Sequence, residues 1–307
     1  MDSIPTWNIF PETTRNFPPD QLATCTELGL TGDRAYREIS SRLLGYPGAQ
    51  QLLEEVHEFY GIYLSYIESS EFTSTLYAIH LQHDPIALES ANIQLQLGTD
   101  RTVEALAHEL LHLHLPMLGF PLGESVRVPL QLDHYAQSFL SMCNWVVNVV
   151  QHEINFQRFT GLGFDRRRFL ARRVSPMDYE RRLCSVFPDR DSWQVDFSRW
   201  CIEHVRHLLT ARHGGNEDSL GYAQDALDWG SQLHPELKET AAAIHRWFED
   251  RIFAEPDRYA RQVNLLLDLM RIPEFTRWVT LKRSDYKKPV AVRLDSKRIC
   301  SLVACIA

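Results

Sequence analysis

Residues 105–116 read Ala105-Leu-Ala-His-Glu-Leu-Leu-His-Leu-His-Leu-Pro116 and carry most of the information on fold and chemistry. His108 and His112 are four residues apart, so on a helix both imidazoles leave the same face, one turn apart. That spacing lets two ring nitrogens reach one tetrahedral Zn²⁺ at about 2.0–2.1 Å. Glu109 lies about 100° further round the helix, close to the metal but off the face of the two ligands. The opposite face is rich in leucine and suited to packing on a sheet.

This spacing supplies two metal ligands and a general base within five residues. Zn²⁺ lowers the pKa of a bound water towards about 7, and a carboxylate beside it can take the proton and pass it to a leaving amine. His108 and His112 are therefore candidate zinc ligands, and Glu109 is the candidate general base. The sequence predicts a zinc-dependent metallohydrolase that cleaves a peptide or amide bond.

In this motif the chain resembles the zincin metallopeptidases, whose signature is the same His-Glu-x-x-His. The resemblance covers the strand before the motif, the motif helix and the helix that follows, about 70 residues in all. It assigns no particular family among the zincins. It implies a protease with one Zn²⁺ per chain and a peptide or protein substrate.

A catalytic zinc with three protein ligands needs one further donor. The candidates lie on the next predicted helix, where His152 precedes Glu153. Glu153 falls inside the apolar arc of that helix, where a buried carboxylate needs a cation to offset its desolvation. We favour Glu153, which thermolysin-like zincins also imply, although those enzymes bring their glutamate sooner after the motif. His152 is the alternative ligand, His134 is a further candidate, and an arginine such as Arg158 or Arg166 is the competing partner for Glu153.

The segment between the two helices contributes further candidates. Tyr135 or His134 is a candidate donor to the developing oxyanion, a role that zincins often give to such a side chain; both also suit an ordinary helix start. Arginines are concentrated downstream, where they indicate either recognition of an acidic substrate or a solvated face that neutralises nearby acids. These arginines are Arg158, Arg166, Arg167, Arg168, Arg172, Arg173, Arg181 and Arg182.

Two other functions compete with the hydrolase. Glu54 with His57 and Glu109 with His112 are both Glu-x-x-His pairs on predicted helices, as in a carboxylate-bridged di-iron bundle. The strands predicted between the pairs, and the unused His108, argue against that bundle. The second alternative is a non-catalytic module of zincin fold that serves as a sensor or binding protein.

The predicted fold class is α+β and helix-rich. Apolar periodicity predicts helices at 33–44, 49–67, 102–115, 133–159, 177–186, 191–213, 219–232, 235–253 and 257–270, and strands at 73–81 and 91–97. We expect an extended N-terminal arm at 1–30, a zincin-like metal-binding domain with a small sheet at 31–175, a helical region completing the cleft at 176–285, and a basic C-terminal tail at 286–307.

Composition limits the partners. The chain has 307 residues, with 32 Lys and Arg against 40 Asp and Glu and a formal net charge of −8, which argues against a general nucleic-acid binder. Six cysteines without a Cys-x-x-Cys pair favour a reducing compartment. We see no signal peptide or membrane span, so the expected location is cytoplasmic. The sequence leaves the oligomeric state open.

Overall fold

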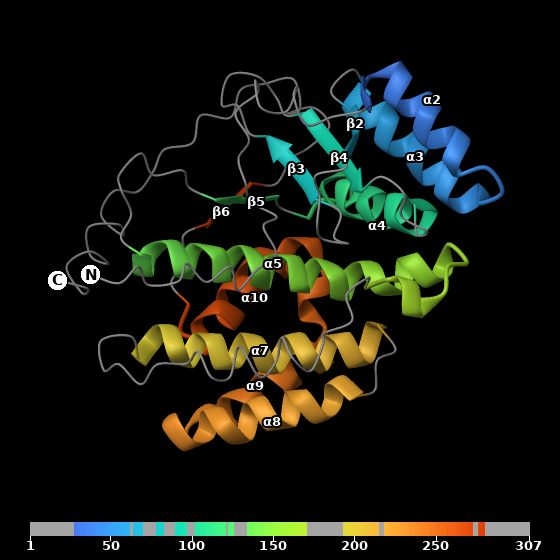
Figure 1. Cartoon of the computed structure of the whole chain (residues 1–307). Helices are drawn as coiled ribbons and strands as arrows, with labels where there is room; N and C mark the ends of the chain where they lie inside the picture. Colours follow the sequence, from blue (N-terminus) through green and yellow to red (C-terminus); the bar gives the residue numbers. More distant parts are fainter. Residues whose placement is uncertain are drawn as a thin grey trace, which may run out of the picture.

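The computed structural model describes residues 28–61, 64–69, 78–82, 90–96, 102–120, 122–125, 134–170, 193–214, 218–272 and 276–279. In this part of the chain a small sheet with three helices forms the N-terminal portion, and a stack of longer helices forms the rest (Figure 1). The predicted α+β, helix-rich class is thus confirmed.

Up to residue 125 the order of elements is β1, α2, α3, β2, β3, β4, α4, η2 and β5. The strands are β1 (Leu28–Thr31), β2 (Leu64–Ser69), β3 (Ala78–Gln82), β4 (Ser90–Gln96), β5 (Leu122–Ser125) and β6 (Thr276–Val279). The helices are α2 (Asp33–Arg42), α3 (Pro47–Tyr60), α4 (Thr102–His114), α5 (His134–Gly161), α7 (Trp193–Gly214), α8 (Asp218–Leu233), α9 (Leu237–Asp250) and α10 (Pro256–Leu269). Short 3₁₀ turns are η2 (Pro116–Leu118), η3 (Arg166–Arg168) and η5 (Ile252–Ala254).

Four strands form the main sheet, in the order β1-β2-β4-β3. The central pair is parallel, with Leu64 opposite Ala91 and Tyr66 opposite Ile93, and both edge strands run antiparallel to their neighbours. These four side chains share one face of the sheet because residues two apart in a strand point the same way. They are buried in one core with apolar residues of α2, α3 and α4.

Helix α4 carries the His-Glu-x-x-His motif and packs as the sequence predicts. Leu106, Leu110 and Leu113 are completely buried in the core that includes the sheet. The buried hydroxyl of Tyr60 donates a hydrogen bond to the carbonyl oxygen of Leu113, at 3.1 Å, and ties α3 to the end of this helix. The leucine face is therefore held against the N-terminal core.

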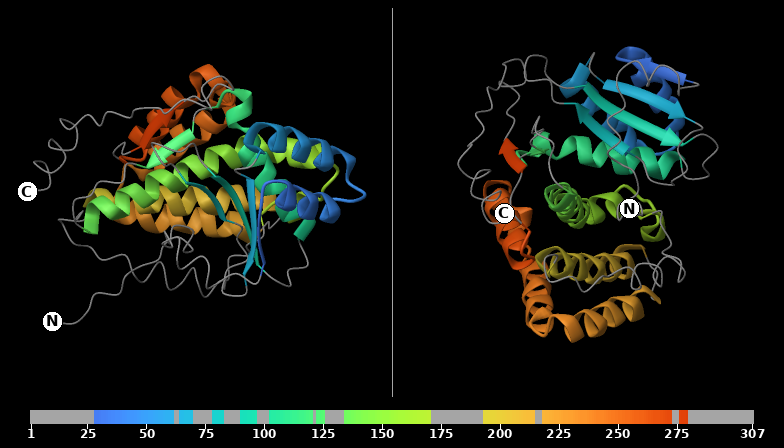
Figure 2. Two further views of the ribbon diagram at one scale, coloured as in Figure 1. Left: turned by 90° about the horizontal axis from the view of Figure 1, so that it is seen from above. Right: turned by 60° about the vertical axis from the view of Figure 1, so that its left-hand side comes forward.

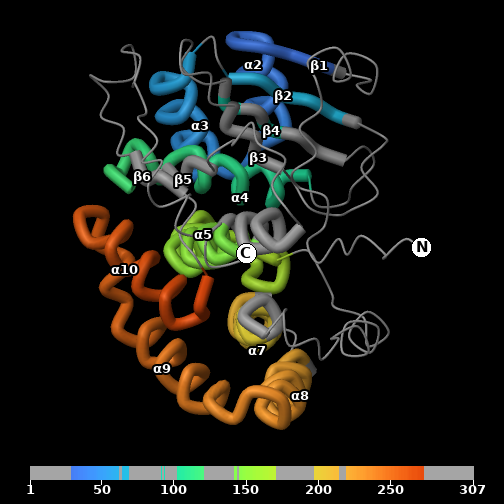
Figure 3. Tube along the Cα trace, turned by 90° about the vertical axis from the view of Figure 1, so that its left-hand side faces the viewer, coloured from blue at the N-terminus to red at the C-terminus, as the bar shows by residue number. Residues whose placement is uncertain are grey.

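Helix α5 lies between the two halves of the molecule. Figures 1 and 3 show α4, α5, α7 and α8 in successive layers, with α9 and α10 returning along one side. The other views agree (Figure 2). Met142, Val146 and Val150 of α5 are buried in the core of the C-terminal helices, whereas Phe159, near its end, belongs to the N-terminal core. One helix therefore completes both cores.

Two predicted boundaries are wrong. The helix expected over 49–67 ends at Tyr60, since Gly61 caps it with φ of 54°, and residues 64–69 form β2 instead. The expected arm over 1–30 gives way to strand β1 from Leu28, which pairs with β2. Strands β5 and β6 were not predicted; they pair antiparallel across a long separation in sequence.

Several predictions lie outside the described residues. They are the helix at 177–186, the tail at 286–307, most of the arm at 1–30 and the first part of the strand at 73–81. No helix among the described residues is long and apolar enough to cross a bilayer.

Two glycines of α8 provide a test of the packing among α7, α8 and α9. A Cβ on Gly230 would lie 2.5 Å from Leu237 Cδ2 and 2.8 Å from Trp200 Cγ, whereas a Cβ on Gly221 meets nothing within 4 Å. We expect Gly230→Ala to lower the free energy of unfolding by about 1–3 kcal/mol through overpacking. Gly221→Ala, the control, should be neutral or raise it by up to about 1 kcal/mol. Urea unfolding measures both, and equal effects would contradict this packing.

Candidate metal centre

Three histidines from two helices meet between α4 and α5. His108 Nε2 lies 3.1 Å from His152 Nε2 and 3.2 Å from His112 Nε2. The three rings are almost equidistant, with centroid separations of 4.9, 4.9 and 5.0 Å. Among the described residues, this is the group of His, Cys, Asp or Glu whose ligand atoms lie close enough together to hold a metal ion.

The separations match what a tetrahedral ion requires. Two nitrogens bound at about 2.0–2.1 Å to one tetrahedral Zn²⁺ lie about 3.3 Å apart. The rings are inclined to one another by 53° to 66°, and one ligand atom from each histidine lies within 4.8 Å of those of the other two. The residues therefore fit a metal ion bound by three imidazoles.

A second histidine pair shows what an ordinary contact looks like. His204 and His245 have Nε2 atoms 2.9 Å apart in rings that are nearly coplanar, at 12°. His204 Nδ1 donates to the carbonyl oxygen of Ala223, so His204 Nε2 accepts one proton from His245. One hydrogen bond explains this pair, whereas a single shared proton cannot satisfy three converging nitrogens.

Gln151 fixes the orientation of one candidate ligand. His112 Nδ1 lies 2.9 Å from Gln151 Oε1, and because an amide oxygen only accepts, His112 carries its proton on Nδ1 and directs the Nε2 lone pair to the centre. Burial raises the pKa of the Tyr259 hydroxyl on α10, and the Gln151 side chain opposes this effect.

The environment keeps the imidazoles neutral. Desolvation lowers the pKa of His108 and His152 well below the ordinary value, and it lowers the pKa of His112 to about 4. Phe169, just after η3, contributes to this desolvation because its ring packs against His108 and His152 at centroid distances of 4.8 and 5.6 Å. Neutral imidazole is the form that binds a metal.

Glu109, the candidate general base, is only 3% exposed. It follows His108 directly on α4, so its carboxyl leaves the helix about 100° from that ligand. Burial raises the pKa of this carboxyl well above its ordinary value. A nearby cation would oppose that effect and favour the carboxylate.

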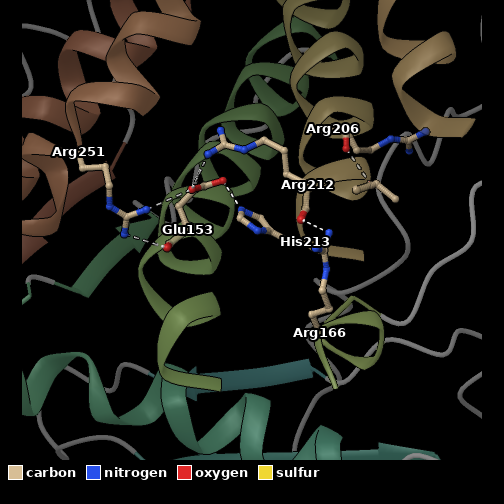
Figure 4. Close-up of polar contacts among 7 residues, drawn as sticks. Glu153, Arg166, Arg206, Arg212, His213 and Arg251 are labelled. Carbon is tan, nitrogen blue, oxygen red and sulfur yellow. Dashed lines mark hydrogen bonds and ion pairs between the residues drawn. The ribbon is translucent and has the colours of Figure 1, made fainter. Parts of the chain in front are cut away.

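Glu153, the favoured third ligand, does not join the histidines, and His152 takes that place. The Glu153 carboxylate is completely buried, and its Oε1 contacts His213 Nε2 (Figure 4). Its Oε2 lies 3.7 Å from Arg251 Nη1 and 4.0 Å from Arg212 Nη2. A buried carboxylate needs a nearby cation, and here protein side chains supply it. The arginines near Glu153 are Arg212 and Arg251, and not Arg158 or Arg166, the partners that the sequence suggested.

The remaining candidate residues lie elsewhere. Tyr135 and His134 begin α5, but their side chains are outside the described part of the structure. His57 stacks on Tyr36, and its Nε2 lies 3.5 Å from Asp33 Oδ1. The pair Glu54 and His57 is therefore not brought to His112, and the geometry of a di-iron bundle is absent from the described residues.

Arginines near the centre mainly contact other parts of the protein. Arg168 pairs with Glu104, Arg158 contacts His114 and Asn155, and Arg166 donates to the carbonyl oxygen of Arg212. Arg172, Arg173, Arg181 and Arg182 lie outside the described residues. Of these contacts, the one between Arg168 and Glu104 neutralises an acid.

Sequence reasoning missed Gln151 and Phe169. Gln151 directly precedes His152 and offered a signal, since a polar residue beside a candidate ligand can orient another ligand. Phe169 offered no such signal in the sequence.

Comparison with models of known protein families, with curated proteins and with solved structures finds no match.

We expect the purified chain to bind about one Zn²⁺ by elemental mass spectrometry. His108→Ala, His112→Ala and His152→Ala should each lose it, whereas Glu153→Gln and the control His204→Gln should retain it. Gln151→Ala should weaken affinity by about 10–100-fold, measured by chelator competition. Retention by His152→Ala together with loss by Glu153→Gln would restore Glu153 as the third ligand.

The metal-free protein should become less stable in acid. The pKa of His112 is about 4 in the folded chain and about 6.5 in the unfolded chain. The unfolded state therefore binds more protons between these values, so stability falls as the pH drops from 6.5 towards 4. We expect His112→Gln to reduce this slope by up to about 1.4 kcal/mol per pH unit in urea unfolding with a chelator present. Identical slopes would show that His112 is not held neutral.

Proposed function

We propose that this protein is a zinc-dependent metallohydrolase that cleaves a peptide or amide bond. The observation that carries the proposal is the meeting of His108, His112 and His152, with His108 Nε2 lying 3.1 and 3.2 Å from the Nε2 atoms of the other two. The buried Glu109 follows His108 directly on the same helix. Zinc is preferred because a compact set of imidazole nitrogens suits a tetrahedral site.

The ligand set supports a catalytic rather than a purely structural metal. Structural zinc sites are closed by four protein ligands, whereas catalytic sites use three and keep one position open. The described residues supply three histidines. When bound, zinc supplies Lewis acidity, which polarises a carbonyl and makes water more acidic.

Glu109 is proposed to move the proton. Its carboxylate accepts a proton from the attacking water and delivers it to the leaving amine, as its position beside His108 suits. The neutral imidazoles of the three histidines and the apolar ring of Phe169 limit the access of bulk water, which strengthens electrostatic interactions at the centre.

The order of elements gives weaker support for a zincin-like enzyme. Strand β4 leads into the motif helix α4, and the third candidate ligand lies on the next helix, α5. Histidine in place of the thermolysin-like glutamate is a difference from that group. The proposal therefore rests on the site, and the zincin resemblance adds to it.

Glu109→Gln should lose hydrolysis by about 10²–10⁴-fold while keeping its zinc, because the amide cannot accept the proton. A fluorogenic peptide library with zinc-loaded protein measures the rate, and elemental analysis measures the metal. Glu104→Gln is the matched control on the same helix, since Glu104 pairs with Arg168 and should leave the rate unchanged.

Three outcomes separate the alternatives. Zinc bound with hydrolysis that survives Glu109→Gln would remove Glu109 as the base. Zinc bound without hydrolysis of any peptide would favour a binding or sensor module. Iron in place of zinc would overturn the proposed metal.

A further inference from the structure

The carboxylate of Glu153 joins three parts of the chain that are far apart in sequence. Helix α5 provides Glu153, the end of α7 provides Arg212 and His213, and Arg251 caps α9 (Figure 4). We call these four residues the Glu153 cluster. Glu153 directly follows the candidate ligand His152, so the two side chains leave α5 about 100° apart.

Arg251 holds the backbone as well as the side chain of Glu153. Its Nη2 donates to the Glu153 carbonyl oxygen at 3.3 Å, and its Nη1 lies 3.7 Å from Glu153 Oε2. Arg251 itself has φ of 50°, in the left-handed region that favours glycine. Arg251, in an uncommon backbone conformation, therefore contacts Glu153, the residue next to the candidate ligand His152. Such conformations persist where surrounding contacts fix the backbone.

A second connection runs through aromatic rings. His213 packs on Phe156 at a centroid distance of 4.1 Å, and Phe156 packs on Phe169 at 5.3 Å. Phe169 in turn packs on His108 and His152. The Glu153 cluster therefore reaches the centre by two routes, one through the backbone of α5 and one through packed rings.

We propose that Glu153 is a positioning residue for the metal centre: its contacts with His213, Arg212 and Arg251 fix the rotation of α5 so that His152 faces His108 and His112. The affinity of the centre for metal then depends on the C-terminal helices, although none of them supplies a ligand. This inference rests on the proposed metal site.

The test is metal affinity together with the spectrum of the cobalt-substituted protein. Zn²⁺ affinity is measured by chelator competition in the full chain, and the visible absorption of bound Co²⁺ reports ligand geometry. We expect Glu153→Leu to weaken Zn²⁺ binding by about 10–100-fold and to shift the Co²⁺ bands. Glu153→Gln keeps an acceptor for His213 and should recover part of the affinity and of the band position. His213→Leu should resemble Glu153→Leu.

A matched control separates positioning from general stability. The buried Ser198 hydroxyl of α7 donates to the carbonyl oxygen of Met270 at 2.7 Å, which links two C-terminal elements without contact to the centre. Ser198→Ala should lower stability but leave Zn²⁺ affinity and the Co²⁺ spectrum unchanged. If Glu153→Leu does not fold, Glu153→Gln and His213→Leu carry the test.

The outcomes distinguish failure of the positioning role of Glu153 from failure of the metal centre itself. Wild-type protein that binds Zn²⁺ while the folded Glu153 and His213 variants keep its affinity and spectrum would overturn the positioning role alone. Wild-type protein that binds neither ion would overturn the metal centre and, with it, this inference. Equal effects from Ser198→Ala would reduce Glu153 to a general stabilising residue.

Discussion

Three neutral imidazoles cannot satisfy one another. The Nε2 atom of a neutral ring carries either a proton or a lone pair, so among three neighbouring Nε2 atoms at least two are alike and cannot hydrogen-bond to each other. Here His108 Nε2 lies 3.1 Å from His152 Nε2 and 3.2 Å from His112 Nε2. A cation at the centre would satisfy all three at once. Helices α4 and α5 must keep their spacing and rotation for the three histidines to meet, and the sheet packed with α4 and the helices packed with α5 hold them there.

The sequence predicted the motif helix well because its two periodicities agree. Leucines at helical spacing form one face of α4 and histidines another, and no other structure satisfies both patterns. Strand β2 was missed because residues 64–67 continue the apolar repeat of α3, and only Gly61 marks the break. Strands β5 and β6 were missed because pairing across so many residues leaves little local signal.

The choice between Glu153 and His152 shows where single-helix reasoning stops. Its place on the helix predicts that Glu153 is buried and needs a positive partner, and the structure has both features. The identity of that partner depends on α7 and on Arg251, which lie far along the chain. Periodicity describes one helix at a time, so it cannot say which of several cations reaches a buried acid.

Because α5 contributes Met142, Val146 and Val150 to one core and Phe159 to the other, a division of the chain near residue 175 would separate α5 from helices that cover it. A fragment that ended there would expose a long apolar strip of α5 to water. The part of the chain that carries the three histidines is therefore not a transferable module, because removal of the downstream helices would also remove the packing that holds α5 and His152 in place.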